Sequence, residues 1–218
     1  MLRRAFVAGL ALLAVSAAPV PQGRASPGKV RVRLVTSMGA ITVALDAGRA
    51  PKTVANFLAY VDDGRFEGTT FYRTARRKTE PTKGFIQGGV GTDARRMLDP
   101  LPLEPTSKTG LRHLHGTISM AHGPNPNSAN GNFSIMVGDN PGLDARGANP
   151  GFAAFGQVVG GMDVVQRILA LPSGGGRDAM KGQMILKPVT IVRAERLDGV
   201  ARPTGRVKPW QLGLKPAN

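Results

Sequence analysis

Short stretches in which apolar and polar residues alternate recur along the chain, separated by turn residues. This pattern limits the possible folds most strongly, because a period of two places apolar side chains on one face of a β-strand. Residues 30–35 and 41–45 alternate in this way and flank a turn at residues 37–40, which predicts a β-hairpin. Further short strands are predicted at residues 69–73, 85–87, 117–121, 133–137, 155–159 and 189–193.

Two other segments follow a helical period. Pro51 suits the first position of a helix, and apolar residues follow it at positions 54, 57, 58 and 61 until Gly64. A second apolar stripe begins at Met162 and is ended by Pro172 and the glycine run 174–176. Many short strands with two helices predict a mainly β fold, a closed barrel whose ends are covered by the helices.

The first residues have the layout of a signal peptide. Arg3 and Arg4 precede an apolar run at residues 5–15, and small residues follow at 16–18. The run is shorter than the roughly 20 residues that span a bilayer. We therefore expect residues 1–25 to be a signal peptide and linker, and the mature chain to be periplasmic or secreted without membrane attachment. A retained anchor or a buried helix is the alternative.

Composition narrows the function classes. The chain has no cysteine, which excludes a disulfide framework, a thiolate metal site and a cysteine nucleophile. Its net charge of +15 favours anionic partners, but no block of five or six like charges occurs and no aromatic residues alternate with the basic ones. We expect no specific nucleic-acid partner. An anion-binding role for Arg76, Arg77, Lys78 and the Gly/Pro-rich basic tail at residues 199–218, expected to be extended, is a weaker alternative.

One arginine stands out within the stretch 70–89. Arg73 ends an apolar run, and the chain returns through Phe85 and Gln87 into a Gly-Gly turn. An arginine among apolar residues is costly unless its fixed fork of donors is used. A peptide bond preceding proline could use it, because rotation about this partly double bond is slow and the twisted amide exposes a nitrogen lone pair. Donation to that lone pair would stabilise the twisted state selectively and needs no metal or cofactor.

Five motifs then follow in a fixed order, at residues 71–73, 85–89, 116–121, 130–135 and 155–165. Together they resemble the cyclophilin family of peptidyl-prolyl cis-trans isomerases over residues 29–198. The resemblance implies a closed eight-stranded antiparallel barrel capped by two α-helices, with the active site on the outer face. It also implies a monomer that needs no cofactor and accelerates rotation of X–Pro bonds in unfolded or exported proteins.

The resemblance assigns site residues by position. Arg73 matches the catalytic arginine. Substrate contacts are assigned to Tyr72, Phe85, Gln87, Ala121, Asn132, Phe133, Leu143 and Phe152.

The chain also departs from the family pattern. Gly84 and Ser134 stand where the family has pocket phenylalanines, about six extra residues lie between Arg73 and Gln87, and Gly142 replaces a tryptophan that holds cyclosporin in some members. Weak cyclosporin sensitivity is therefore expected. These departures motivate the alternative of a catalytically weak module that binds proline-containing segments.

Two other patterns have ordinary interpretations. His113 and His115 could suggest a metal pair, but no carboxylate or third imidazole stands at a helpful spacing, so we expect turn or strand histidines. Ser119 lacks the Gly-x-Ser-x-Gly elbow of a hydrolase.

Overall fold

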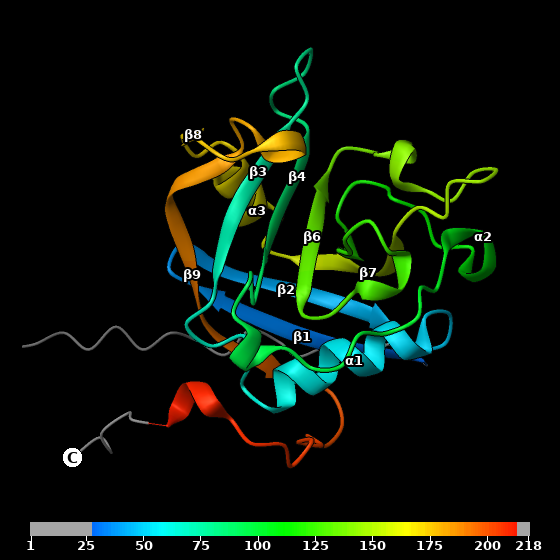
Figure 1. Cartoon of the computed structure of the whole chain (residues 1–218), viewed down its shortest axis with the longest axis vertical. Coiled ribbons are helices and arrows are strands. Elements are labelled where there is room, and N and C mark those ends of the chain that lie inside the picture. The colour runs from blue at the N-terminus through cyan, green and yellow to red at the C-terminus, as the bar shows by residue number, and fades with distance from the viewer. Residues whose placement is uncertain (1–27, 213–218) are drawn as a thin grey trace, which may run out of the picture.

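A closed antiparallel β-barrel forms the body of the protein (Figure 1), whose computed structural model describes residues 28–212. The strand order is β1-β2-β7-β5-β6-β4-β3-β9-β8, and an additional pairing of β1 with β9 closes the barrel with eight strands. The two-residue β8 extends the sheet beyond β9. The strands are β1 (Lys29–Thr36), β2 (Gly39–Asp46), β3 (Thr70–Arg76), β4 (Gly84–Gly89), β5 (Thr117–Met120), β6 (Asn132–Val137), β7 (Ala153–Gly160), β8 (Ser173–Gly174) and β9 (Met184–Arg196).

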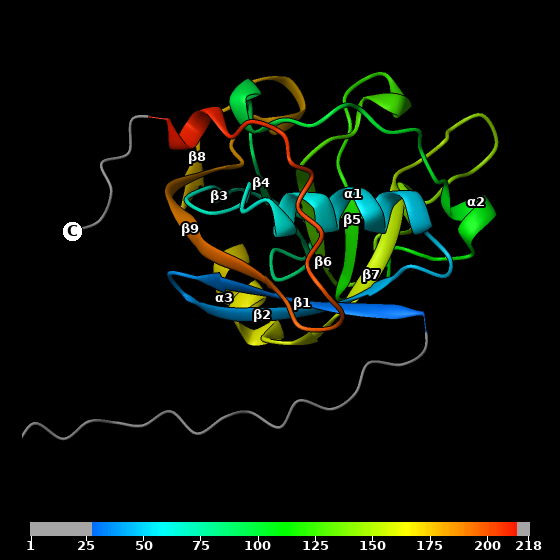
Figure 2. The same ribbon diagram turned by 90° about the horizontal axis from the view of Figure 1, so that it is seen from below.

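Helices cover the barrel from different sides (Figure 2). Helix α1 (Pro51–Asp62) contacts β2, β7 and β9, whereas α3 (Met162–Leu169) contacts β2, β3, β4 and β6. The predicted hairpin, the closed eight-stranded barrel and both helices are confirmed. The one-turn helix α2 (Thr106–Thr109) was not predicted, because four residues are too few to show a helical period.

Phenylalanine rings fill the space between α1 and the barrel. Phe57 of α1 is fully buried, and its ring centre lies 5.0 Å from that of Phe66, 5.3 Å from Phe133 and 5.3 Å from Phe155. Contacts of this kind add about 0.5–1.5 kcal/mol per pair to the gain from area burial. Helix α1 is therefore an integral part of the core.

The described part of the C-terminal tail docks on the domain. Residues 199–212 cross α1 (Figure 2), where the Thr204 backbone N and Oγ1 donate to Asp63 at 2.7 and 2.6 Å. The Trp210 ring lies 4.8 Å from the guanidinium carbon of Arg65 and 5.1 Å from that of Arg96. Asp63 and Arg65 are almost fully buried and paired at 2.8 Å, so the tail supplies partners to polar groups that water cannot reach.

The expected signal peptide, residues 1–25, lies outside the described residues. Within residues 28–212, no helix has both the length and the apolar character needed to cross a bilayer.

Candidate active site

A small pocket of about 110 Å³ opens on the outer face of the barrel, between strands β3 to β6 and the loop that precedes β7. Strand register brings its walls together: Arg73 pairs with Gln87, Gln87 with Ser134, and Phe85 with Met136. Six of the nine predicted site residues line this pocket, namely Arg73, Phe85, Gln87, Ala121, Leu143 and Phe152.

The Arg73 guanidinium is half-buried and held by uncharged acceptors. Its Nη1 donates to Gln87 Oε1 at 2.8 Å and its Nε donates to Gln183 Oε1 at 2.8 Å. Its Nη2 makes a longer contact of 3.3 Å to the Ala179 carbonyl. The guanidinium carbon lies 5.2 Å from the centre of the Phe85 ring. Burial lowers the pKa of the Arg73 guanidinium from its ordinary value, but a guanidinium remains charged at neutral pH. None of the ion pairs formed by residues 28–212 involves Arg73.

Phe133 does not line the pocket, contrary to the sequence expectation. It is fully buried inside the barrel, with its ring centre 5.4 Å from that of Phe66 and 5.6 Å from that of Phe71. Side chains alternate along β6, so a residue whose neighbours Asn132 and Ser134 face outward must face the core.

The same alternation places Met136 in the pocket, a residue that the sequence reasoning missed. Met136 is fully buried, lines the pocket beside Ser134, and stands opposite Phe85 in the β4–β6 register. Methionine is flexible enough to fill irregular apolar spaces. The pocket thus has an apolar floor although Ser134 stands where an aromatic residue was expected. Counting two residues on from Ser134 would have identified Met136.

Gly84 is required by the backbone and is not among the residues that line the small pocket. Its φ is +140°, and a Cβ at this position would lie 2.0 Å from the Ala75 carbonyl oxygen. Residues with a side chain rarely adopt this conformation. The pairing of Gly84 with Arg76 at the start of β4 depends on this close approach.

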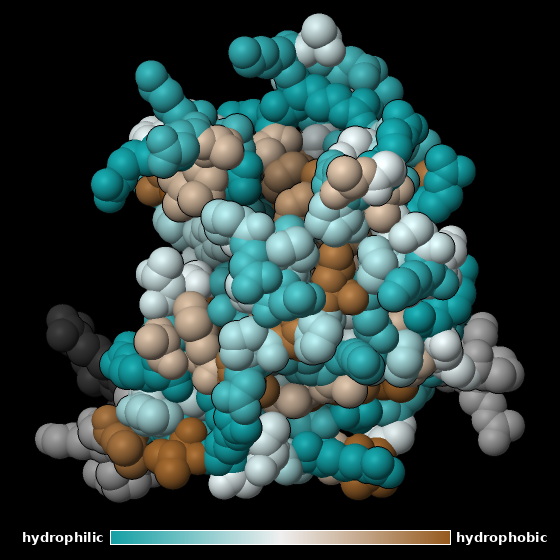
Figure 3. All heavy atoms as spheres, turned by 45° about the vertical axis from the view of Figure 1, so that its right-hand side comes forward, coloured by the Kyte–Doolittle hydropathy of each residue, from teal (hydrophilic) through white to brown (hydrophobic). Residues whose placement is uncertain are grey.

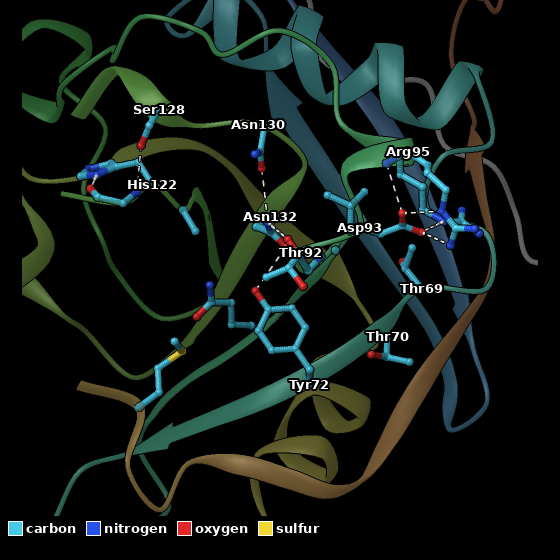
Figure 4. A pocket seen from close by; sticks show the side chains of 18 of the residues that line it. Thr69, Thr70, Tyr72, Thr92, Asp93, Arg95, His122, Ser128, Asn130 and Asn132 are labelled. Carbon is cyan, nitrogen blue, oxygen red and sulfur yellow. Dashed lines mark hydrogen bonds and ion pairs between the residues drawn. The ribbon is translucent and has the colours of Figure 1, made fainter. Parts of the chain in front are cut away.

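Tyr72 and Asn132 line a neighbouring hollow of about 870 Å³, which shares Gln87, Ala121 and His122 with the small pocket (Figure 4). The Tyr72 hydroxyl donates to Asn132 Oδ1 at 3.2 Å. Burial raises the pKa of Tyr72 to about 12, although the charge of Arg73 opposes the shift, so the phenol stays protonated.

In a space-filling view, hydrophobic side chains show in recesses between largely hydrophilic lobes (Figure 3). The two hollows together form a groove that can accommodate residues on either side of a proline.

A buried line of hydrogen bonds supports the pocket wall. His113 Nδ1 lies 2.7 Å from Asp144 Oδ1, and His113 Nε2 lies 2.8 Å from Ser119 Oγ. Burial lowers the pKa of His113, although Asp144 opposes the shift. The neutral ring then donates from Nδ1 to the carboxylate and accepts the Ser119 hydroxyl at Nε2. The line joins β5 to the loop carrying Leu143.

His115 and His122 have local partners. His115 Nδ1 accepts from the Gly138 backbone N at 3.0 Å. The His122 ring stacks on Phe152 with centres 4.3 Å apart, which places both at the rim of the pocket. In the part of the chain that the structure describes, no three side chains of the metal-ligating types gather into a cluster.

Two arginines at the end of β3 and the start of the following loop bind groups within the chain. Arg76 Nη1 donates to the carbonyls of Leu169 and Leu171 at 3.1 and 2.9 Å, at the end of α3. Arg77 pairs with Glu80 at 3.2 Å. Two of the arginines behind the anion-binding alternative are therefore already engaged within the chain.

Known proteins resemble this chain in sequence and in fold. The family described as cyclophilin type peptidyl-prolyl cis-trans isomerase/CLD matches residues 31–196, from within β1 to the end of β9. Peptidyl-prolyl cis-trans isomerase A of Dickeya dadantii is 39% identical over 146 residues, covering 66% of this chain and 73% of the relative. A peptidyl-prolyl cis-trans isomerase of Streptomyces antibioticus is 37% identical over 170 residues, covering 76% and 98%.

Solved structures share the fold. A cyclophilin type isomerase of Cryptosporidium parvum, crystallised in the presence of the dipeptide Ala-Pro, matches with a TM-score of 0.61 and 22% identity, covering 78% of this chain and 99% of that one.

Proposed function

The chain belongs to the cyclophilin-type peptidyl-prolyl cis-trans isomerases, and from this premise we propose that Arg73 drives the rotation of X–Pro bonds in exported polypeptides. The observation that carries the proposal is the half-buried Arg73 guanidinium beside an apolar pocket, held by Gln87 and Gln183.

The chemical difficulty is the partial double bond of the amide. Its rotational barrier is about 18–20 kcal/mol, and at the barrier resonance is lost and the proline nitrogen gains a usable lone pair. A donor aimed at that nitrogen stabilises the twisted amide more than either planar form, and only such differential stabilisation accelerates the step. The Arg73 guanidinium supplies the donor. Its half-buried setting strengthens the interaction relative to bulk water.

The rest of the groove holds the substrate. The proline ring can bind against an apolar surface formed by Phe85, Met136, Leu143 and Phe152. The side-chain amide of Gln87 can hydrogen-bond the substrate backbone next to the ring. The neighbouring hollow with Tyr72 takes the residues beside the proline. Because the ring is held while the preceding carbonyl swings, binding energy is directed to the twisted state.

The test is isomerisation of an X–Pro peptide, followed by exchange NMR with the chain lacking residues 1–25. We expect Arg73→Ala to lower kcat/KM by roughly a hundredfold, as expected when a positioned donor to the transition state is lost. Arg193→Ala is the matched control, since this arginine is exposed on β9 and pairs with Glu195. Full activity in Arg73→Ala would refute the mechanism. Peptide binding without turnover in the parent chain would favour the binding-module alternative.

Export is part of the same proposal and is supported by the basic, apolar and small-residue segments of residues 1–18. Full-length chain expressed in a Gram-negative host should be recovered from the periplasm without its first residues, as intact mass would show. Recovery in the cytoplasm with residue 1 retained would argue against export.

A further inference from the structure

We propose that Gln183 is a positioning residue for isomerisation, acting by holding the plane of the Arg73 guanidinium through Nε. This inference rests on the catalytic role proposed for Arg73. Gln183 has no counterpart among the residues predicted from the sequence, because it lies 110 positions from Arg73 in the chain.

The backbone of Gln183 is fixed next to Arg73. Its carbonyl accepts from the Thr74 backbone N at 2.9 Å, and its own N donates to the Met180 carbonyl at 3.0 Å. The following residue, Met184, begins β9 and pairs with Arg73 in the β3–β9 register. These main-chain bonds do not depend on the side chain, which therefore reaches Arg73 from an anchored position.

Two glutamine side-chain oxygens bind the Arg73 guanidinium, one from each side of β3, where β4 and β9 pair with it. Gln87 on β4 binds Nη1, and Gln183, the residue immediately before β9, binds Nε, each at 2.8 Å. Two such contacts fix both the position and the plane of a rigid fork, whereas one contact leaves the plane free to turn. The 3.3 Å contact from Nη2 to Ala179 is the weakest of the set. Nη2 can therefore most readily exchange its present hydrogen bond for one to a substrate nitrogen.

The chemical type of the acceptor also matters. An amide oxygen orients the guanidinium without adding charge, so the full positive charge stays available to the twisted amide. A carboxylate at the same place would form a bidentate or charge-assisted pair and would offset that charge. Gln183→Glu therefore keeps the acceptor but changes the electrostatics, and Gln183→Leu removes the acceptor at similar size.

The experiment measures kcat and KM by exchange NMR for the parent chain, Gln183→Leu, Gln183→Glu, Arg73→Ala and the Arg73→Ala/Gln183→Leu double variant. We expect Gln183→Leu to lower kcat roughly tenfold, the scale of losing one hydrogen bond to a charged group, with KM and melting temperature little changed. Gln183→Glu should also lower kcat. In the Arg73→Ala background, Gln183→Leu should cause no further loss.

A spectroscopic readout keeps the proposal testable if a variant is poorly active. The Arg73 Nε–H proton should exchange with water faster in Gln183→Leu than in the parent, and remain protected in Gln183→Glu. Full kcat in Gln183→Leu, or an equal loss with and without Arg73, would overturn the role of Gln183 and leave that of Arg73 intact. Full activity in Arg73→Ala would instead overturn the proposed mechanism itself.

Discussion

Substitution of Gly84 tests two explanations for the glycine at this position. Either the backbone conformation requires glycine, or the pocket lacks an aromatic side chain that could be restored. A Cβ at residue 84 would lie 2.0 Å from the Ala75 carbonyl oxygen and 3.0 Å from the Arg76 Cα, at a φ of +140°. Such a conformation costs a non-glycine residue about 1–3 kcal/mol, and opening the β3–β4 ladder loses about 1 kcal/mol per hydrogen bond. We expect Gly84→Ala to lower the free energy of unfolding by about 2–4 kcal/mol.

Urea unfolding of the chain lacking residues 1–25 measures this loss, with an unchanged m-value showing that stability alone has changed. Gly142→Ala is the matched control, because a Cβ there meets no atom within 4 Å and its φ is not in the left-handed region. It should be near neutral. If Gly84→Phe were as stable as the parent and more active, the position would be an empty pocket wall and the backbone argument would be refuted.

Three further predictions follow from the pocket, the buried histidine and the tail. Met136→Ala should raise KM for X–Pro peptides more than it lowers kcat and should cost about 2–5 kcal/mol of stability, because Met136 is fully buried in the pocket floor; isomerisation kinetics and urea unfolding check both. Since burial lowers the pKa of His113 below its ordinary 6.5, the unfolded chain takes up the proton more readily. The contribution of the neutral His113 ring to the free energy of unfolding should therefore be full above about pH 6.5 and be lost as the pH falls. His113→Gln should flatten this pH dependence in thermal melts, and an unchanged slope would contradict the argument. Trp210→Ala should lower stability by about 1–2 kcal/mol by removing the contacts to Arg65 and Arg96, whereas the exposed Leu212→Ala should not; equal melting temperatures for both would exclude a docked tail.

The barrel could be predicted from the sequence because each strand and helix shows its own pattern of apolar residues within a few positions. Alternation in residues 30–35 and 41–45, and the helical stripe after Pro51, depend on neighbours only a few positions away. Arg73, Gln87 and Leu143 were likewise placed together by the order of motifs, and the structure brings them to one pocket.

What the sequence missed depends on long-range pairing. Phe133 was assigned to the pocket because it follows a site residue in the motif, but alternation along β6 turns its side chain into the interior that the closed barrel creates. Gln183 meets Arg73 only because β9 pairs with β3. The tail was expected to be extended because it lacks periodicity, yet Thr204 and Trp210 bind buried charges that only the folded domain assembles.

These long-range contacts explain how the site tolerates its departures from the family pattern. Arg73 lies on a strand paired on both sides, so its Cα is set by the barrel rather than by the adjoining loop. The residues between β3 and β4 therefore extend the hairpin beyond the paired part of the sheet that holds Arg73. Met136 on β6 and Phe85 on β4 pair with each other and line the pocket beside Ser134. Because the sheet fixes the positions and flexible side chains fill the remaining volume, changes in the identity of pocket residues should alter substrate preference before they abolish turnover.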